Sequence, residues 1–190
     1  MKKIIIMLSM LISCINVDAQ FNKVGRTALQ FLKIGMGARQ AAQGEASIAN
    51  HQDINSIFWN PAAITNIDNI QASFNYTSWI SDLKVLSGGI GLRLGEIGII
   101  SFGVIQMDYG DLDEAITTST SGGLDTRTGL KFGGSDLALS FGFARNFTNK
   151  LSIGVNIKYI REELHTFSSN VWAFDVGSYY ETGWKGIRLG

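Results

Sequence analysis

A strict alternation of bulky apolar residues with small or polar ones limits the folds open to this chain more than any other feature. It is clearest in residues 150–162, where Leu, Ile, Val and Tyr occupy every second position and Ser, Gly, Asn and Lys stand between them. Side chains of a β-strand point alternately to its two faces, so this pattern predicts a strand with two unlike faces. Comparable runs occupy residues 70–76, 86–94, 97–109, 136–147 and 171–180. The fold class we expect is therefore all-β.

The alternation in residues 97–109 changes phase near Ile99–Ile100 and again near Val104–Ile105. An extra residue in one strand of a pair shifts the phase in this way, so we expect a β-bulge in this segment. Such a bulge would kink the sheet at that point.

The connections between the expected strands are of two kinds, which alternate along the chain. Short turns are expected at residues 95–96, 148–149 and 182–183, and longer connections at residues 81–84, 110–134 and 165–170. Outer-membrane β-barrels have short periplasmic turns and longer extracellular loops. We therefore predict a transmembrane antiparallel β-barrel whose longer loops lie outside the cell.

The two faces of the expected strands differ in a way that favours a membrane. Charged residues make up 17% of the chain, below the roughly 25% of soluble domains, and the less apolar face carries mostly Gly, Ser, Ala and Asn. Such a face is too poor in charge for a solvated surface, so we expect it to enclose a lumen. The polar residues predicted to face that lumen are Arg93, Asn156, Lys158 and Asp175. A soluble sandwich or lipocalin-like barrel is the alternative, because alternation alone does not identify the face that meets water.

Residues 20–69 lack the alternation and are expected to form a plug, or hatch, inside the partial barrel of residues 70–190. Asp53 is suited to cap a helical turn that ends at Phe58. Pro61, the one proline of the chain, suits the first position of a turn capped by Asn60, where no hydrogen bond is lost. In a barrel wall it would remove one. The residues assigned to the plug are Gly35, Gly37, Arg39, Gly44, Asp53, Trp59, Asn60 and Pro61.

The N-terminus has the features of a secretory signal peptide. Two lysines precede an apolar run from Ile4 to Ile15, and Val17 and Ala19 occupy the small-residue positions of a cleavage site. The run is shorter than the about 20 residues that a membrane-spanning helix needs. We expect residues 1–19 to direct export and to be removed after Ala19. The alternative is that Cys14 is a lipidation site.

Two segments of the expected plug resemble a known family. The stretches "FLKIGMGARQAAQGEASIA" and "DINSIFWNPAAI" resemble the PorV/PorQ family of outer-membrane proteins, which is itself similar to the FadL-type channels. The resemblance covers residues 24–66 closely, whereas the strands match only in style. It implies a barrel plugged by a hatch with an Asn-Pro-Ala element, which here corresponds to Asn60, Pro61 and Ala62.

The resemblance also implies a function. Members similar to PorV act in type IX protein secretion, where they hold or shuttle cargo that carries a C-terminal sorting domain. This implies secreted cargo and the secretion translocon as partners, with outer-membrane lipid around the barrel of a Gram-negative bacterium. The alternative, implied by the similarity to FadL, is a channel for hydrophobic small molecules.

The count of expected strands is seven, the last one beginning at Trp184, whereas single-chain bacterial barrels have an even number of eight or more. An open sheet in lipid would leave unpaired backbone groups. We therefore expect the sequence to be the N-terminal part of a longer protein, or an incomplete gene product.

Other classes of function are disfavoured by composition. The 16 basic and 16 acidic residues leave no net charge that would attract nucleic acid. The chain has two histidines, His51 and His165, and neither stands in a pattern typical of nucleophilic catalysis. The acidic residues between 108 and 125 lack the spacing of a calcium loop. We expect no enzymatic activity, no cofactor and no metal.

Overall fold

The computed structural model describes residues 28–49, 53–80, 83–117 and 125–190, with the side chains of 116–117 and 125–127 excepted. The chain divides into two units, Met1–Gln30 and Phe31–Gly190. Of the first unit only residues 28–30 are described, and the sheet belongs to the second. The expected signal peptide with its cleavage site, Cys14 and His51 lie outside the described residues.

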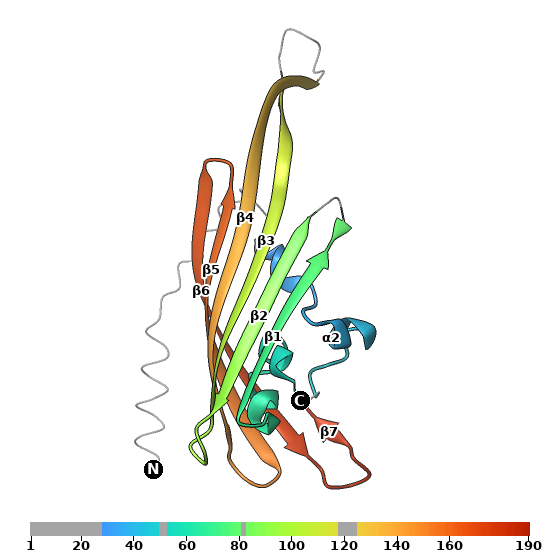
Figure 1. Ribbon diagram of the computed structural model, residues 1–190, viewed down its shortest axis with the longest axis vertical. Helices are drawn as coiled ribbons and strands as arrows, with labels where there is room; N and C mark the ends of the chain where they lie inside the picture. Colours follow the sequence, from blue (N-terminus) through green and yellow to red (C-terminus); the bar gives the residue numbers. More distant parts are fainter. Residues whose placement is uncertain (1–27, 50–52, 81–82, 118–124) are drawn as a thin grey trace, which may run out of the picture. The chain divides into compact units, whose positions relative to one another are not determined.

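The second unit is built on one antiparallel sheet of seven strands in the order of the sequence (Figure 1). This confirms the all-β prediction. Among the described residues the sheet is open, because β1 pairs with β2 alone and β7 with β6 alone. The strands are β1 (Ile70–Ser78), β2 (Lys84–Arg93), β3 (Ile99–Thr117), β4 (Asp125–Asn146), β5 (Leu151–Leu164), β6 (Phe167–Glu181) and β7 (Arg188–Leu189).

The register places large apolar side chains in rows across one face of the sheet, which we call the outer face. Phe102 of β3, for example, pairs with Phe141 of β4 and is 46% exposed, and Phe141 is 57% exposed. Unpartnered apolar side chains on this scale are uncommon in soluble monomers. The whole row consists of Ala72, Ile90, Phe102, Phe141, Ile157 and Phe174.

Two of the expected long connections are wrong. Most of residues 110–134 belongs to β3 and β4, so the expected loop is largely a two-stranded ribbon, and its residues 118–124 lie outside the described part. The connection expected at 165–170 shortens to His165 and Thr166, because β5 and β6 extend toward each other. Gly, Asp, Ser and Thr are typical of turns, but here their backbones pair across a hairpin and the strands continue through them.

The expected bulge is also misplaced. Pairing on both sides of β3 is continuous from Ile99 to Asp108, and the inner positions of this stretch are simply more apolar than those of the other strands. The register shifts later, between Asp108 and Asp111 and between Asp113 and Ala115. Gly110 at φ 64° and Gly129 at φ 77° lie at these irregularities, where left-handed backbone is accessible to glycine without strain.

Four short helical elements precede the sheet, and the last two cover its inner face (Figure 1). η2 contacts β1, β2 and β3, and η3 contacts β4, β5 and β6. The caps agree with the prediction: Asp53 accepts from the backbone N–H of Asn55, and Asn60 from that of Ala62 with Pro61 at the first position. The elements are η1 (Gln30–Lys33), α2 (Ala38–Ala42), η2 (Ile54–Phe58) and η3 (Pro61–Asn66).

Candidate functional site: the inner face and its covering segment

The core of the unit lies between residues 53–67, which contain η2 and η3 and which we call the covering segment, and the inner face of the sheet. Four isoleucines of the segment, each at most 3% exposed, form one cluster with two residues of the sheet. A second cluster consists of Ala62, Ala63 and Tyr179 of β6. The first cluster contains Ile54, Ile57, Ile64, Ile67, Ile99 and Ala144.

Glycines of β2 and β3 make room for η2. A Cβ atom at Gly89 would lie 2.8 Å from Ile57 Cδ1, and one at Gly91 would lie 2.7 Å from Ile54 Cδ1. Gly103 of β3 would likewise meet Ile57. Real Cβ contacts are not this short, so the isoleucines reach the backbone of the sheet only because these positions lack side chains.

Two further glycines, on β5 and β6, lie directly against the start of η3. Gly154 of β5 and Gly177 of β6 are cross-strand partners on the inner face. A Cβ at Gly154 would overlap the backbone of Pro61 and Ala62, and one at Gly177 would overlap the side chain of Asn60. The Asn60–Ala62 turn therefore rests directly on the backbone of two strands.

Asn60 fastens this turn to the sheet and to the preceding segment. Its Nδ2 donates to the carbonyl oxygen of Ser178 in β6 (2.8 Å) and to that of Ile48 (3.0 Å), while its Oδ1 accepts from Ala62 N (3.0 Å). The neighbouring Trp59 donates its indole N–H to the Met36 carbonyl (3.0 Å). Asn60 is 3% exposed, so its amide lies inside the core, and its bond from Ala62 N is buried.

The end of η3 is held by polar side chains of the wall. Arg93 of β2 donates to the carbonyl oxygens of Thr65 (2.8 Å) and Ile67 (3.2 Å from Nε). These groups lie at the C-terminal end of η3, where a cation is favourably placed. Thr65 Oγ1 donates to Ser152 Oγ (2.9 Å), and Ser152 donates to Asn146 Oδ1 (2.7 Å).

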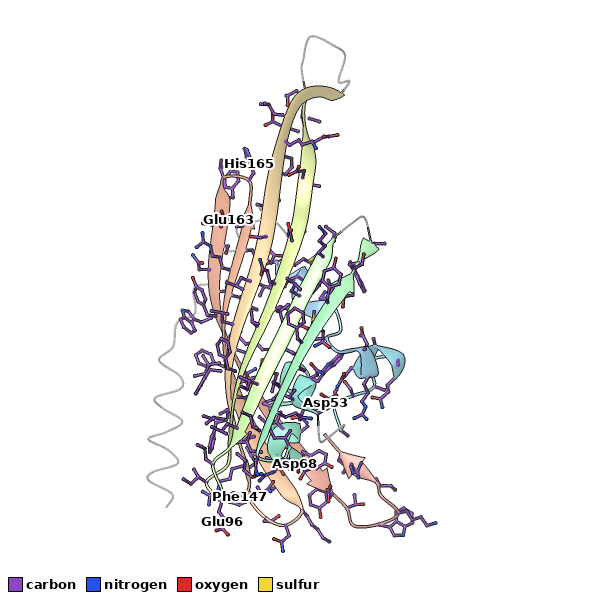
Figure 2. All side chains as sticks on the ribbon, in the orientation of Figure 1. Asp53, Asp68, Glu96, Phe147, Glu163 and His165 are labelled. Atoms are coloured by element: carbon purple, nitrogen blue, oxygen red, sulfur yellow. The ribbon has the colours of Figure 1, made fainter. Side chains whose placement is uncertain are left out.

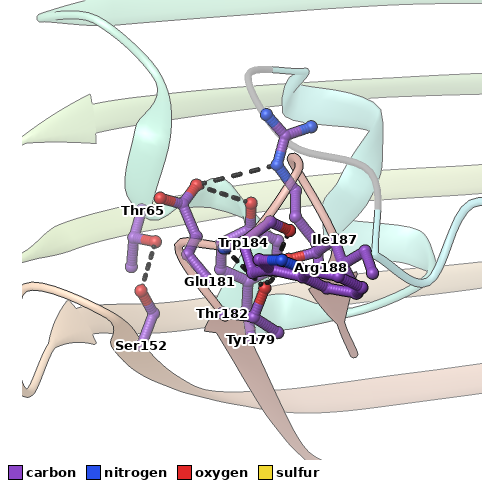
Figure 3. A network of polar contacts seen from close by, with 8 residues as sticks. All are labelled: Thr65, Ser152, Tyr179, Glu181, Thr182, Trp184, Ile187 and Arg188. Atoms are coloured by element: carbon purple, nitrogen blue, oxygen red, sulfur yellow. Dashed lines mark hydrogen bonds and ion pairs between the residues drawn. The ribbon is translucent and has the colours of Figure 1, made fainter.

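Figure 3 shows the polar network that continues from this point across the end of β6. The buried Tyr179 donates its hydroxyl to Glu181 Oε1 (2.9 Å), which lies 3.7 Å from Arg188 Nε of β7. Thr182 Oγ1 donates to the Ile187 carbonyl (2.8 Å) and closes the β6–β7 connection. These contacts keep the hydroxyl end of Tyr179 hydrogen-bonded, while its ring packs against η3.

η2 is tied to β1 in a comparable way. Asn55 Oδ1 accepts from Ser73 Oγ (2.8 Å) and from Asn75 Nδ2 (2.9 Å), both on the inner face of β1. Asp53 joins this group to α2, because its Oδ2 accepts from the buried Gln40 Nε2 (2.9 Å). Figure 2 labels Asp53 on the covering segment beside the sheet.

The other residues assigned to the plug lie around α2. Gly37, at φ 97°, precedes the helix and Gly44, at φ 61°, follows it. A Cβ at Gly35 would lie 2.5 Å from Glu45 Oε1. Arg39 is in the helix and exposed. The nearest atoms that the N-terminal segment places against the inner-face glycines come from residues 54–67 and not from these four, so the structure does not bring the whole predicted set together.

The residues predicted to face a lumen lie on the inner face. Lys158 of β5 and Asp175 of β6 form an ion pair with Nζ and Oδ2 2.7 Å apart. Asn156, the cross-strand partner of Asp175, is 2% exposed. Whether this face encloses a lumen remains a prediction, since the sheet is open. The packing of the Asn60–Ala62 turn on Gly154 and Gly177 and the Thr65–Ser152 contact were not predicted, although a glycine at an inner position of each strand was a signal for the first of them.

His165 and Glu163 lie at the opposite end of the sheet from Glu96 and Phe147 (Figure 2). The ring of His165 meets Phe132 edge-on at 5.5 Å. Among the described residues no cluster of three or more His, Cys, Asp or Glu side chains is arranged to hold a metal ion. None of the described helices has the length and apolar character needed to cross a membrane.

The fold and the covered inner face define the class. It is an antiparallel β-sheet protein whose N-terminal segment packs against glycines on one face of the sheet. A family model described as the type IX secretion system protein PorV matches residues 17–183. The chain belongs to the PorV family, which confirms the resemblance seen in the sequence. No curated protein matches it in a separate search.

Proposed function

We propose that this protein is an outer-membrane component of type IX secretion that binds exported cargo and shuttles it. The family match over residues 17–183 carries the proposal. In it, a leader of residues 1–19 directs export, residues 20–69 plug the barrel, and residues 70–190 supply part of the wall. The shuttle role requires a membrane-embedded surface and a surface that reaches the cargo.

The outer face supports placement in a membrane. On β5 its apolar residues run from Leu151 to Tyr159, about 26 Å along the strand at ~3.3 Å per residue. After a strand tilt of about 40° this is roughly 20 Å, comparable with the apolar band of about 25 Å in outer-membrane barrels. Beyond the band, the outer positions become charged or hydroxylic at Lys84, Asp108 and Ser135.

The β3–β4 ribbon is the surface that we assign to cargo or translocon. β2 pairs with β3 only as far as Asp108, and β5 pairs with β4 only from Gly134. Beyond these residues β3 and β4 pair only with each other, so the ribbon projects past its neighbours (Figure 1). Its outer side chains include Asp111 and Lys131, an exposed pair 3.6 Å apart. A projecting hairpin with both edges unpaired suits contact with another protein.

The test shortens the ribbon without disturbing the wall. Residues 112–132 are replaced by an Asn-Gly turn between Asp111 and Gly133, which already pair. The matched control replaces His165 and Thr166 by Asn-Gly between Leu164 and Phe167, a paired position at the same end of the sheet. The measurement is secretion of a cargo protein with a C-terminal sorting domain.

We expect secretion to fall at least tenfold in the shortened variant and to stay unchanged in the control, with equal amounts of both in the membrane. Normal secretion by the shortened variant would contradict the assignment of the ribbon. If uptake of a fatty acid were lost at the same time, a channel for hydrophobic molecules would be favoured. A kink in the wall at 97–105 would have supported that alternative. The strands show no kink there, because pairing is continuous from Ile99 to Asp108.

A further inference from the structure

A hollow of about 420 Å³ lies at the end of the sheet where the short turns are. It is bounded by the β2–β3 turn, by the β4–β5 turn and by Thr65 at the end of η3. Figure 2 labels Glu96 and Phe147 at this end of the sheet. The volume falls within the range of small-molecule sites. We call it the Arg93–Arg145 hollow, and its charged or amide side chains are Arg93, Glu96, Arg145, Asn146 and Asn149.

Strand pairing brings the two arginines to this hollow from β2 and β4, on either side of β3. Arg93, the last residue of β2, pairs with Ile99. Ile99 pairs in turn with Ala144 of β4, which precedes Arg145. Arg93 is held in place by its bonds to two carbonyl oxygens at the end of η3. One guanidinium of the hollow is therefore already fixed, which lowers the cost of binding a ligand.

Neither arginine has a carboxylate partner within the described part of the chain. The ion pairs there involve other residues, and Nη1 of Arg93 makes no hydrogen bond to any described residue. Glu96 is the one acidic residue that lines the hollow, and it is exposed on its turn. Charges that are partly removed from water are usually paired. The excess of positive charge here therefore suits an anion.

We infer that the Arg93–Arg145 hollow binds a phosphate group. A guanidinium presents several N–H donors in one plane, and these match the oxygens of a phosphate. Two guanidinium groups can share one phosphate, whereas a carboxylate is matched by a single one. The side-chain amides of Asn146 and Asn149 supply further donors. The hollow is larger than a single phosphate, so room remains for the rest of a phosphate ester.

Two exposed apolar side chains stand beside the hollow. Ile97 on the β2–β3 turn is 64% exposed, and Phe147 on the β4–β5 turn is 73% exposed. Aromatic side chains in outer-membrane barrels gather at the level of the lipid headgroups. Lipid headgroups and soluble phosphate compounds both present the phosphate group, and the test below separates these two sources. The inference goes beyond the secretion role and does not rest on it.

The test offers two phosphate probes to the purified protein in nonionic micelles. Inorganic phosphate is titrated by isothermal titration calorimetry, with chloride adjusted to keep the ionic strength constant. Phosphatidylglycerol is added to the micelles in a second series, and bound lipid is counted by native mass spectrometry. Diacylglycerol with the same acyl chains is the phosphate-free control. Binding of inorganic phosphate without a preference for phosphatidylglycerol supports a soluble ligand, and a preference for phosphatidylglycerol over diacylglycerol supports a lipid headgroup.

Three variants test whether the arginines make the site. Arg145→Gln removes one guanidinium, while Arg93, which also holds η3, is left intact. Lys150→Gln is the matched control, because it removes the same charge at the same end of the sheet from a residue that lines the neighbouring hollow and not this one. Glu96→Gln removes the opposing carboxylate. Circular dichroism checks that each variant is folded.

We expect Arg145→Gln to weaken binding of the probe at least about tenfold, because a charged donor group is lost. Lys150→Gln should change binding less than about twofold, since exposed charges outside the hollow are screened. Glu96→Gln should tighten binding, an effect that general loosening of the structure does not produce. Binding of neither probe by the parent would overturn the inference. Unchanged binding in Arg145→Gln, or an equal loss in Lys150→Gln, would also overturn it, because general surface charge would then be the cause.

Discussion

At the residue scale, the fit between segment and sheet depends on positions that carry no side chain. Gly154→Ala should destabilise the unit by about 1–3 kcal/mol, the usual cost of overpacking, because the new methyl group overlaps the backbone of Pro61 and Ala62. Gly133→Ala is the control, since its Cβ would meet only Gly110 O at 3.4 Å. Denaturant unfolding in micelles measures both. Equal midpoints for the two variants would show that the turn does not rest on Gly154.

A second prediction at this scale concerns the cap of η2. Asp53→Ala removes the acceptor of Asn55 N and of Gln40 Nε2 and should cost about 0.5–2 kcal/mol, as loss of an N-cap usually does. Asp53→Asn keeps an oxygen that can cap the turn, so it should cost less. The comparison uses the same unfolding measurement. A loss as large for the asparagine variant would mean that the second oxygen of Asp53, which accepts from Gln40, or its charge matters more than its cap.

At the element scale, the sequence predicted what depends on neighbours along the chain. Alternation located the six long strands, and the residue types around Asp53 and Pro61 located two caps, because both signals are local. The ribbon was missed since turn-forming residues such as Gly110 can lie in a hairpin as bulges. The packing of the Asn60–Ala62 turn on the sheet was missed, because Gly154 and Gly177 become neighbours only through the pairing of β5 with β6.

The ribbon itself allows a prediction about dynamics. Residues 111–117 of β3 have one paired neighbour, whereas residues 99–108 lie between two. Local opening is easier where fewer contacts must break. Hydrogen exchange followed by mass spectrometry should therefore show faster exchange in peptides from 111–117 than in those from 99–108. Equal protection of both would indicate that the ribbon is covered by something beyond β3 and β4.

At the scale of the whole molecule, the decisive question is which medium meets the outer face. Phe141→Arg places a charge in the middle of the apolar rows, where lipid would penalise it by about 2–4 kcal/mol. Water would not, since this side chain is 57% exposed. Ser135→Arg is the control on the same strand and face, in the row that contains Lys84 and Asp108. Unfolding in lipid vesicles should show the full penalty for Phe141→Arg and almost none for Ser135→Arg. A protein that stays soluble without detergent and tolerates both changes would instead have a water-exposed outer face, and its place in the membrane would have to be abandoned.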